Sequence, residues 1–238
     1  MGTSTARRGP GTAAWRWAKG AATRYMASED ISHGAQELLS HYVAALKESS
    51  RASAQGLLAD FRLIRKVAQN LGELGERSRA LGLPEALADM GLPPLATAPG
   101  EVAALSLVAR WLPGEFGLEA AVAATALAPC LKKLWGEDTV APPPKGSAGL
   151  VKTFLALALA HRLLLDLGES LEGAATSWSV FNERSALLEK KLQEAAQSVS
   201  LTPPRSGEWL GLPGWLWVTR VLENLFHNYT PKGQTHKI

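Results

Sequence analysis

Apolar residues recur every three or four positions along most of the chain, which is the spacing of one face of an α-helix. Such stripes run through residues 28–50, 52–81, 101–112, 176–200 and 215–229. Ala and Leu dominate the composition and β-branched residues are sparse, a bias that favours helix over sheet. The pattern therefore predicts an all-α fold, in the form of an irregular multi-helix bundle.

The first two stripes predict a helical hairpin. Residues 28–50 begin with Ser28 followed by two acids, a typical helix start because acids are favourable at the positive end of the helix dipole. A second helix is expected over 52–81 after a short break. We expect these two helices to pair in antiparallel fashion.

The segment 150–167 is apolar at 13 of its 18 positions, which raises the question of a membrane span. Lys152, Arg162 and Asp166 interrupt it, and each charge at the centre of a span costs about 3 kcal/mol. The longest uncharged run in the chain is 12 residues, whereas about 20 are needed to cross a bilayer. We therefore expect the central helix of a protein core and no transmembrane helix.

Prolines and glycines divide the helical pattern. Four prolines between residues 82 and 100 predict an irregular segment, and Pro129 predicts a kink or an early end of the helix around it. Three successive prolines in 139–149 predict a polyproline linker. A loosened stretch is expected from Gly168 to Ala175.

These breaks suggest an N-terminal arm, two helical subdomains joined by a linker, and a tail. The expected ranges are 1–27 for the basic arm, 28–138 for the first subdomain, 139–149 for the Pro-rich linker, 150–230 for the second subdomain with its Trp-rich C-terminal helix, and 231–238 for the tail.

The net charge of +3 belongs to the N-terminal arm. Residues 1–28 contain five basic residues and no acid, which leaves the rest of the chain at −2. The composition of the arm is typical of a mitochondrial targeting segment, and it lacks the apolar stretch of a secretory signal. Such an arm buries too little to offset an ordering entropy of about 1–2 kcal/mol per residue, so we expect a neighbouring molecule to hold it.

On a helical wheel the arm has an apolar and a basic side, as in helices that import receptors or anionic membranes bind. The apolar side comprises Trp15, Ala18, Ala22, Tyr25 and Met26, and the other side comprises Arg16, Lys19, Thr23 and Arg24.

The segment GEWLGLPGWLWVTRVLENLFHNYT, residues 207–230, places Trp209, Trp215 and Trp217 around a Gly-Pro-Gly break. After the break, a regular apolar stripe predicts a helix that docks by one face. The apolar residues around the break are too many for one stripe, so we expect some outside the core. Exposed tryptophans serve as anchors in protein interfaces or lie among lipid headgroups, and packing against the protein's own core is the third interpretation.

The sequence contains no catalytic signature, such as GxSxG, HExxH, CxxC or a dinucleotide fingerprint. GSAGLVKT, residues 146–153, is a near miss for a phosphate loop, but its glycine spacing differs and it follows prolines where a strand is required. The single Cys130 excludes an internal disulfide. His161, inside the most apolar helix, is interpreted as a core histidine. We expect no catalytic residue, no cofactor and no small-molecule substrate.

The best metal candidates are residues four apart along one predicted helix, a spacing that aligns ligands. They lie opposite the apolar face of that helix, so we expect a solvated polar face and no metal site. The residues are Glu29, His33, Glu37 and His41.

These features predict a non-catalytic accessory subunit of a large organellar assembly. We expect a mitochondrial protein on the matrix side or associated with the inner membrane, in a complex such as a respiratory enzyme or ATP synthase. Its partners would be other protein subunits, with membrane surface or lipid headgroups as a further contact. The predicted partner-binding residues are Arg7, Arg8, Trp15, Arg16, Trp17, Lys19 and Arg24 in the arm and Trp209, Trp215 and Trp217 near the C-terminus.

Two alternatives remain open. The first is a mitochondrial ribosomal or other RNA-associated protein whose arm neutralises phosphates, although the −2 balance of the body is poor for wrapping RNA. The second is a small helical enzyme or lipid-binding protein with a cavity around His161.

Overall fold

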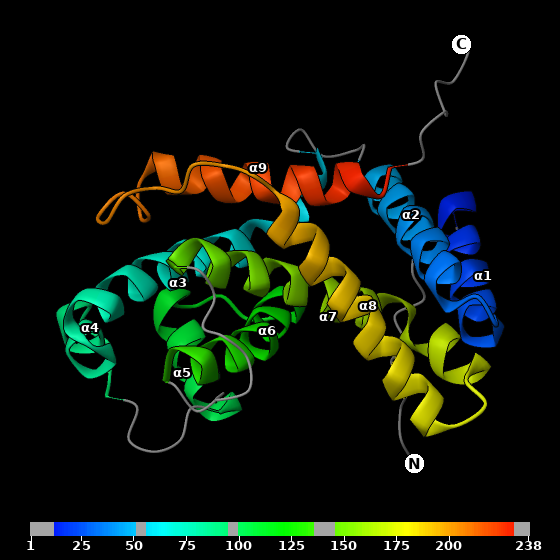
Figure 1. The fold of residues 1–238 in the computed structure, drawn as a ribbon, viewed down its shortest axis with the longest axis horizontal. Coiled ribbons are helices and arrows are strands. Elements are labelled where there is room, and N and C mark those ends of the chain that lie inside the picture. The colour runs from blue at the N-terminus through cyan, green and yellow to red at the C-terminus, as the bar shows by residue number, and fades with distance from the viewer. Residues whose placement is uncertain (1–11, 51–55, 95–99, 136–145, 231–238) are drawn as a thin grey trace, which may run out of the picture.

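The structure, a computed structural model, describes residues 12–50, 56–94, 100–135 and 146–230. All regular secondary structure in these ranges is helical, so the predicted all-α fold is confirmed (Figure 1). The helices are α1 (Ala13–Ala27), α2 (Ile31–Ser50), the 3-10 turn η1 (Gly56–Phe61), α3 (Arg62–Leu81), α4 (Leu83–Asp89), α5 (Glu101–Trp111), α6 (Leu118–Trp135), α7 (Gly146–Ala174), α8 (Trp178–Ser198) and α9 (Leu212–Asn228).

Helix α7 is the centre of the bundle and packs against α1, α3, α6 and α8. Every residue from Leu150 to Ala160 except Lys152 is buried. By length and composition alone α7 could cross a membrane, but 67% of its apolar window is buried inside the protein. Packing against the neighbouring helices therefore accounts for its apolar character.

The segments on the two sides of the predicted linker share one hydrophobic core. Helices α3 and α6 precede the linker, and both contact α7, which follows it. Residues 146–149 form the first turn of α7, whereas 136–145 lie outside the described residues. The two subdomains expected from the sequence therefore pack together, and the boundary between them stays a prediction.

The N-terminal arm, from Thr12 onward, packs against its own protein. The face of α1 predicted to be apolar is buried against α2, α7 and α8. Thr12 accepts a hydrogen bond from the Trp15 amide at the start of α1, and the Tyr25 hydroxyl donates to the Arg184 carbonyl oxygen at 2.8 Å. Ordering residues 12–27 therefore requires no neighbouring molecule, contrary to the expectation from composition, because six side chains of α1 are buried.

Three predicted breaks are helical in the structure. Pro84 does not prevent α4, because it lies in the first helical turn, where no amide hydrogen is needed. Helix α6 continues through Pro129 to Trp135, so the expected early end is wrong. Burial of Leu127, Cys130 and Leu131 against the core offsets the hydrogen bond that Pro129 lacks.

Helix α7 likewise continues through Gly168 to Ala174, where the sequence suggested a loosened chain. Leu167 and Leu171 are buried on this stretch, and α7 forms a hairpin with α8. A short turn joins the two helices, and the Ser177 hydroxyl accepts from the Val180 amide at 3.2 Å to cap α8. Tertiary packing therefore overrides the weak helix propensity of glycine.

A partly buried polar cluster joins α2 to α7. The Tyr42 hydroxyl donates to Asp166 Oδ2 at 2.8 Å, and Arg162 Nε donates to the same oxygen at 2.9 Å. Burial, followed by the negative charge of Asp166, raises the pKa of Tyr42 well above its usual value. The phenol therefore stays protonated and keeps donating to the partly buried Asp166 carboxylate.

We expect Tyr42→Phe to lower the free energy of unfolding at pH 7 by about 1–2 kcal/mol, because Asp166 loses one of its two donors. Above pH 10 the unfolded chain releases the Tyr42 proton and the folded chain retains it. Titration of Tyr42 therefore lowers the free energy of unfolding of the wild type by about 1.4 kcal/mol for each pH unit above this point. Tyr42→Phe lacks this effect, so the free energies of unfolding of the two proteins come closer together. Urea unfolding at pH 7 and pH 11 measures both effects. Equal free energies of unfolding at pH 7, or a difference between the two proteins that is the same at both pH values, would contradict the role of Tyr42.

Candidate partner-binding surface

The Trp-rich segment 207–230 folds as a turn followed by helix α9, which lies along the upper edge of the bundle in Figure 1. Pro213 lies in the first turn of α9, where proline is favourable. One face of α9 packs against α3, α7 and α8. The predicted apolar stripe is the face it buries, comprising Val218, Val221, Leu222, Leu225 and Phe226.

Trp209 fixes the start of α9 on α3. Its side chain is fully buried, and a Cβ added at Gly72 of α3 would overlap the indole ring. A Cβ added at Gly214 of α9 would overlap the Trp209 carbonyl group. Gln69 Nε2 donates to the carbonyl oxygens of Trp209 at 2.7 Å and Gly211 at 3.0 Å. The glycines are therefore the residues that let this chain segment approach both helices so closely.

The other two tryptophans complete this contact. Trp217 is 5% exposed and meets Trp209 edge to face, with ring centroids 5.2 Å apart. The Arg65 guanidinium carbon lies 4.0 Å from the centre of the Trp215 ring. Burial lowers the pKa of Arg65, which also donates to Thr219 Oγ1 at 3.1 Å. We call Trp209, Trp215 and Trp217 with Gly72 the tryptophan lock.

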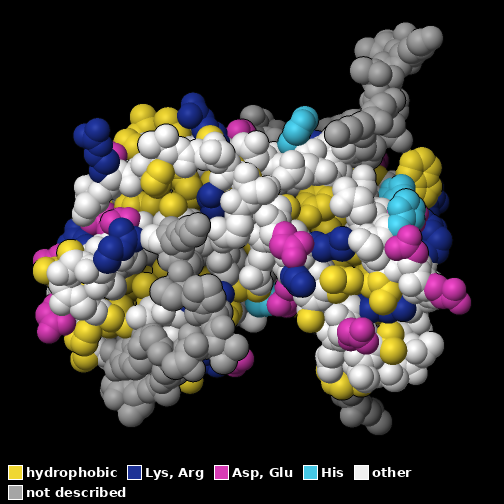
Figure 2. Space-filling view, viewed as in Figure 1, with side chains coloured by type: hydrophobic (Ala, Val, Ile, Leu, Met, Phe, Trp, Pro, Cys, Tyr) yellow, Lys and Arg dark blue, Asp and Glu magenta, His cyan; other side chains and the backbone are white. Residues whose placement is uncertain are grey.

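The large apolar residues left outside the core in this segment are leucines. Leu210, Leu212 and Leu216 are 53%, 67% and 44% exposed. Figure 2 shows hydrophobic side chains gathered over the start of α9, with Lys or Arg on either side. We call these three residues the leucine ridge.

A groove of about 510 Å³ adjoins the leucine ridge at Leu216. Prolines and Trp217 supply its apolar walls, while exposed Glu208 and Arg220 place one charge of each sign on it. Such a groove suits an apolar side chain flanked by polar groups that fix its orientation. The lining residues of this C-terminal groove are Ser200, Leu201, Thr202, Pro203, Pro204, Glu208, Pro213, Leu216, Trp217 and Arg220.

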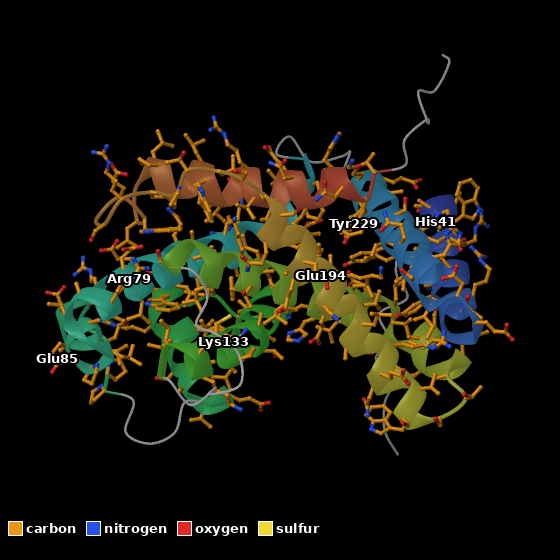
Figure 3. The ribbon with its side chains drawn as sticks, in the orientation of Figure 1. His41, Arg79, Glu85, Lys133, Glu194 and Tyr229 are labelled. Carbon is orange, nitrogen blue, oxygen red and sulfur yellow. The ribbon has the colours of Figure 1, made fainter. Side chains whose placement is uncertain are left out.

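A second exposed aromatic surface lies on α1. Trp17 is 59% exposed and meets the His41 ring edge to face at 6.2 Å. His41 is labelled in Figure 3, at the end of the molecule that α1 and α2 form. Arg16 is exposed nearby in the sequence, whereas Arg24 pairs with Glu37, so the positive charge of Arg24 is matched within the protein.

The structure separates the partner-binding residues predicted from sequence into three groups. Trp15, Trp209 and Trp217 are buried in the protein's own core, and Trp15 Nε1 donates to Ser49 Oγ at 2.7 Å. Their indole rings are therefore not available at the surface in this conformation. The second group is half-buried or exposed and comprises Lys19, Trp215, Arg16, Trp17 and Arg24. The third group, Arg7 and Arg8, lies outside the described residues.

The sequence predicts that some apolar residues around the Gly-Pro-Gly break are exposed, but the predicted binding residues are the tryptophans and not the leucines of the ridge. Leu212 and Leu216 are four apart, on the side of α9 opposite Val221 and Leu225, a spacing that aligns them on one helical face.

Other candidate residues have structural partners. His161 Nε2 lies 3.6 Å from Glu189 Oε1, between α7 and α8. Glu37, one of the four candidate metal ligands, is engaged by Arg24 and lies 3.7 Å from His41. Among the described residues, no three His, Cys, Asp or Glu side chains are grouped to hold a metal. Burial raises the pKa of the Cys130 thiol to about 12, so it is not a thiolate nucleophile at neutral pH.

Comparison with protein-family models, with curated proteins and with solved structures finds no match to this chain.

We expect Gly72→Ala to lower the free energy of unfolding by about 2–3 kcal/mol, because the added methyl group overlaps the buried Trp209 ring. Gly173→Ala is the matched control, since a Cβ there meets nothing within 4 Å. The free energy of unfolding of this control should rise by about 0.5 kcal/mol, because alanine lowers the conformational entropy of the unfolded chain. Urea unfolding followed by tryptophan fluorescence measures both values, and equal effects of the two substitutions would show that the lock is not packed as described.

Proposed function

We propose that this protein is a non-catalytic accessory subunit that binds a neighbouring protein subunit through the leucine ridge and the C-terminal groove. The observation that carries the proposal is the exposure of three leucines on a segment whose backbone the tryptophan lock fixes. Apolar anchors on a rigid element lose little entropy when they bind, so more of the energy of burying them contributes to affinity.

The charges on the C-terminal groove, one of each sign, favour a protein partner over a membrane surface. An anionic membrane attracts cations alone, and Glu208 on the groove would be repelled by it. A protein segment with an apolar centre and charges of both signs matches Glu208 and Arg220 together. Membrane binding is therefore an outcome for the experiment to distinguish.

The finer form of the proposal is a subunit of a mitochondrial assembly associated with the inner membrane, such as a respiratory enzyme or ATP synthase. The targeting-like composition of residues 1–28 supports this location. Exposed Arg16 and Trp17 on α1 provide a second contact for a neighbour, apart from the groove.

The test compares native co-purification of the tagged full chain with that of two variants. Leu212→Glu with Leu216→Glu places charges on the ridge, and Val102→Glu is the matched control because Val102 is 82% exposed on α5. We expect wild type and control to retain the same subunits in fixed proportion. The ridge variant should lose them at least 10-fold, which corresponds to about 1.4 kcal/mol of binding energy.

Thermal melts of the purified proteins verify that all three are folded alike. Retention of the same subunits by the ridge variant would contradict the proposal, as would a wild type that purifies alone. Wild-type binding to anionic vesicles without co-purifying protein would identify a membrane contact instead. Loss of partners on ribonuclease treatment, with no effect of the ridge substitutions, would favour the RNA-associated alternative.

A further inference from the structure

A cavity of about 210 Å³ lies where α7 begins, between the C-terminal parts of α3 and α6. Two cationic side chains reach it from different helices, Arg79 from α3 and Lys133 from α6, and Figure 3 labels both. The residues that line it are Gly75, Ser78, Arg79, Lys133, Leu134, Gly146, Ser147 and Leu150.

Two glycines shape this cavity. Gly146 has a φ of +75°, and a Cβ added there would lie 2.9 Å from Nη2 of Arg79. The guanidinium therefore lies directly against the first turn of α7. Gly75 allows α3 to approach the same turn, since a Cβ there would lie 3.1 Å from the Cβ of Ser147.

The electrostatics of this cavity are those of an anion site. The first turn of a helix carries amide hydrogens without helical partners and a partial positive charge. Arg79 and Lys133 add two full positive charges at this end of α7, where cations are normally unfavourable. Glu76 is the acid in contact: its Oε1 accepts from the Ser147 hydroxyl, and its Oε2 lies 3.3 Å from Nη1 of Arg79.

Among the described residues, one carboxylate against two cations leaves the cavity with an excess of positive charge. Ser78 adds a hydroxyl donor on the same wall, because its Oγ is buried without a hydrogen-bond partner. Cationic side chains that converge with a helix N-terminus on a concave surface are a usual means of binding phosphate.

We infer that this cavity binds a phosphate group through Arg79, Lys133 and the N-terminus of α7. The near-miss phosphate loop GSAGLVKT begins at this point but does not bind as such a loop would, because Lys152 Nζ donates to the Val199 carbonyl oxygen at 2.6 Å. The cations come from two other helices. This site is separate from the leucine ridge and does not depend on the proposed function.

The test titrates inorganic phosphate into the full chain at constant ionic strength, with chloride as the reference anion, and follows the melting temperature. We expect saturable stabilisation with a dissociation constant on the order of 1 mM. Arg79→Gln with Lys133→Gln should raise this constant at least 10-fold, and Lys133→Gln alone should raise it by a smaller factor. Lys66→Gln is the control, since Lys66 is exposed on the same helix as Arg79 and does not line the cavity.

Vesicles of phosphatidylcholine with and without phosphatidic acid distinguish a lipid headgroup from a soluble phosphate. Binding to phosphatidic acid that the double substitution abolishes would identify the headgroup. Saturation by inorganic phosphate without vesicle binding would identify a soluble phosphate compound. The inference is overturned if phosphate raises the melting temperature no more than chloride does. It is also overturned if the Arg79→Gln, Lys133→Gln double variant and the Lys133→Gln single variant bind phosphate as the wild type does.

Discussion

The contact between the Trp209 ring and the Gly72 backbone determines how the segment 207–228, which contains α9, lies on the bundle. A buried indole can lie this close to a helix only where the helix has no side chain, and Gly214 meets the same requirement on α9. Once the ring is in place, Gln69 holds the carbonyl groups that start α9. The direction of α9 then decides which of its residues face solvent. The leucine ridge is exposed because the tryptophan lock sets the direction of α9, and not only because this segment has more apolar residues than one helical face can bury.

The rest of the bundle follows a different rule, in which an almost wholly apolar α7 is surrounded by amphipathic helices. Two of its charged groups meet partners nearby: Asp166 accepts from Tyr42 and Arg162 toward one end, and Lys152 donates to a carbonyl group toward the other. At the first turn of α7, two cations and the helix terminus converge on one carboxylate among the residues that the structure describes. Positive charge that converges on a helix N-terminus favours an anionic ligand.

Local periodicity was enough to predict the helices, the apolar side of α1 and the buried face of α9, because each depends on residues three or four apart. It failed at Pro84, Pro129 and Gly168, where burial by distant helices overrides a local break. The candidate surface was harder to predict. The sequence indicates that some apolar residues around residue 211 stay exposed, but which ones do so depends on Gly72 and Gln69, far away in the chain. The sequence therefore predicted the tryptophans as the binding residues, whereas the packing of the fold buries two of them and leaves the leucines of the ridge exposed.

Fluorine NMR of the protein labelled with 5-fluorotryptophan tests this account most directly, because the chemical shift of an exposed ring changes between H₂O and D₂O. Single Trp→Phe variants assign the resonances. The structure predicts no solvent shift for Trp209 and Trp217, which are 0% and 5% exposed, and a large shift for Trp17 and Trp178, at 59% and 67%. Solvent shifts at Trp209 and Trp217 as large as those at Trp17 would mean that α9 is not locked on α3 and that the tryptophans themselves form the exposed surface.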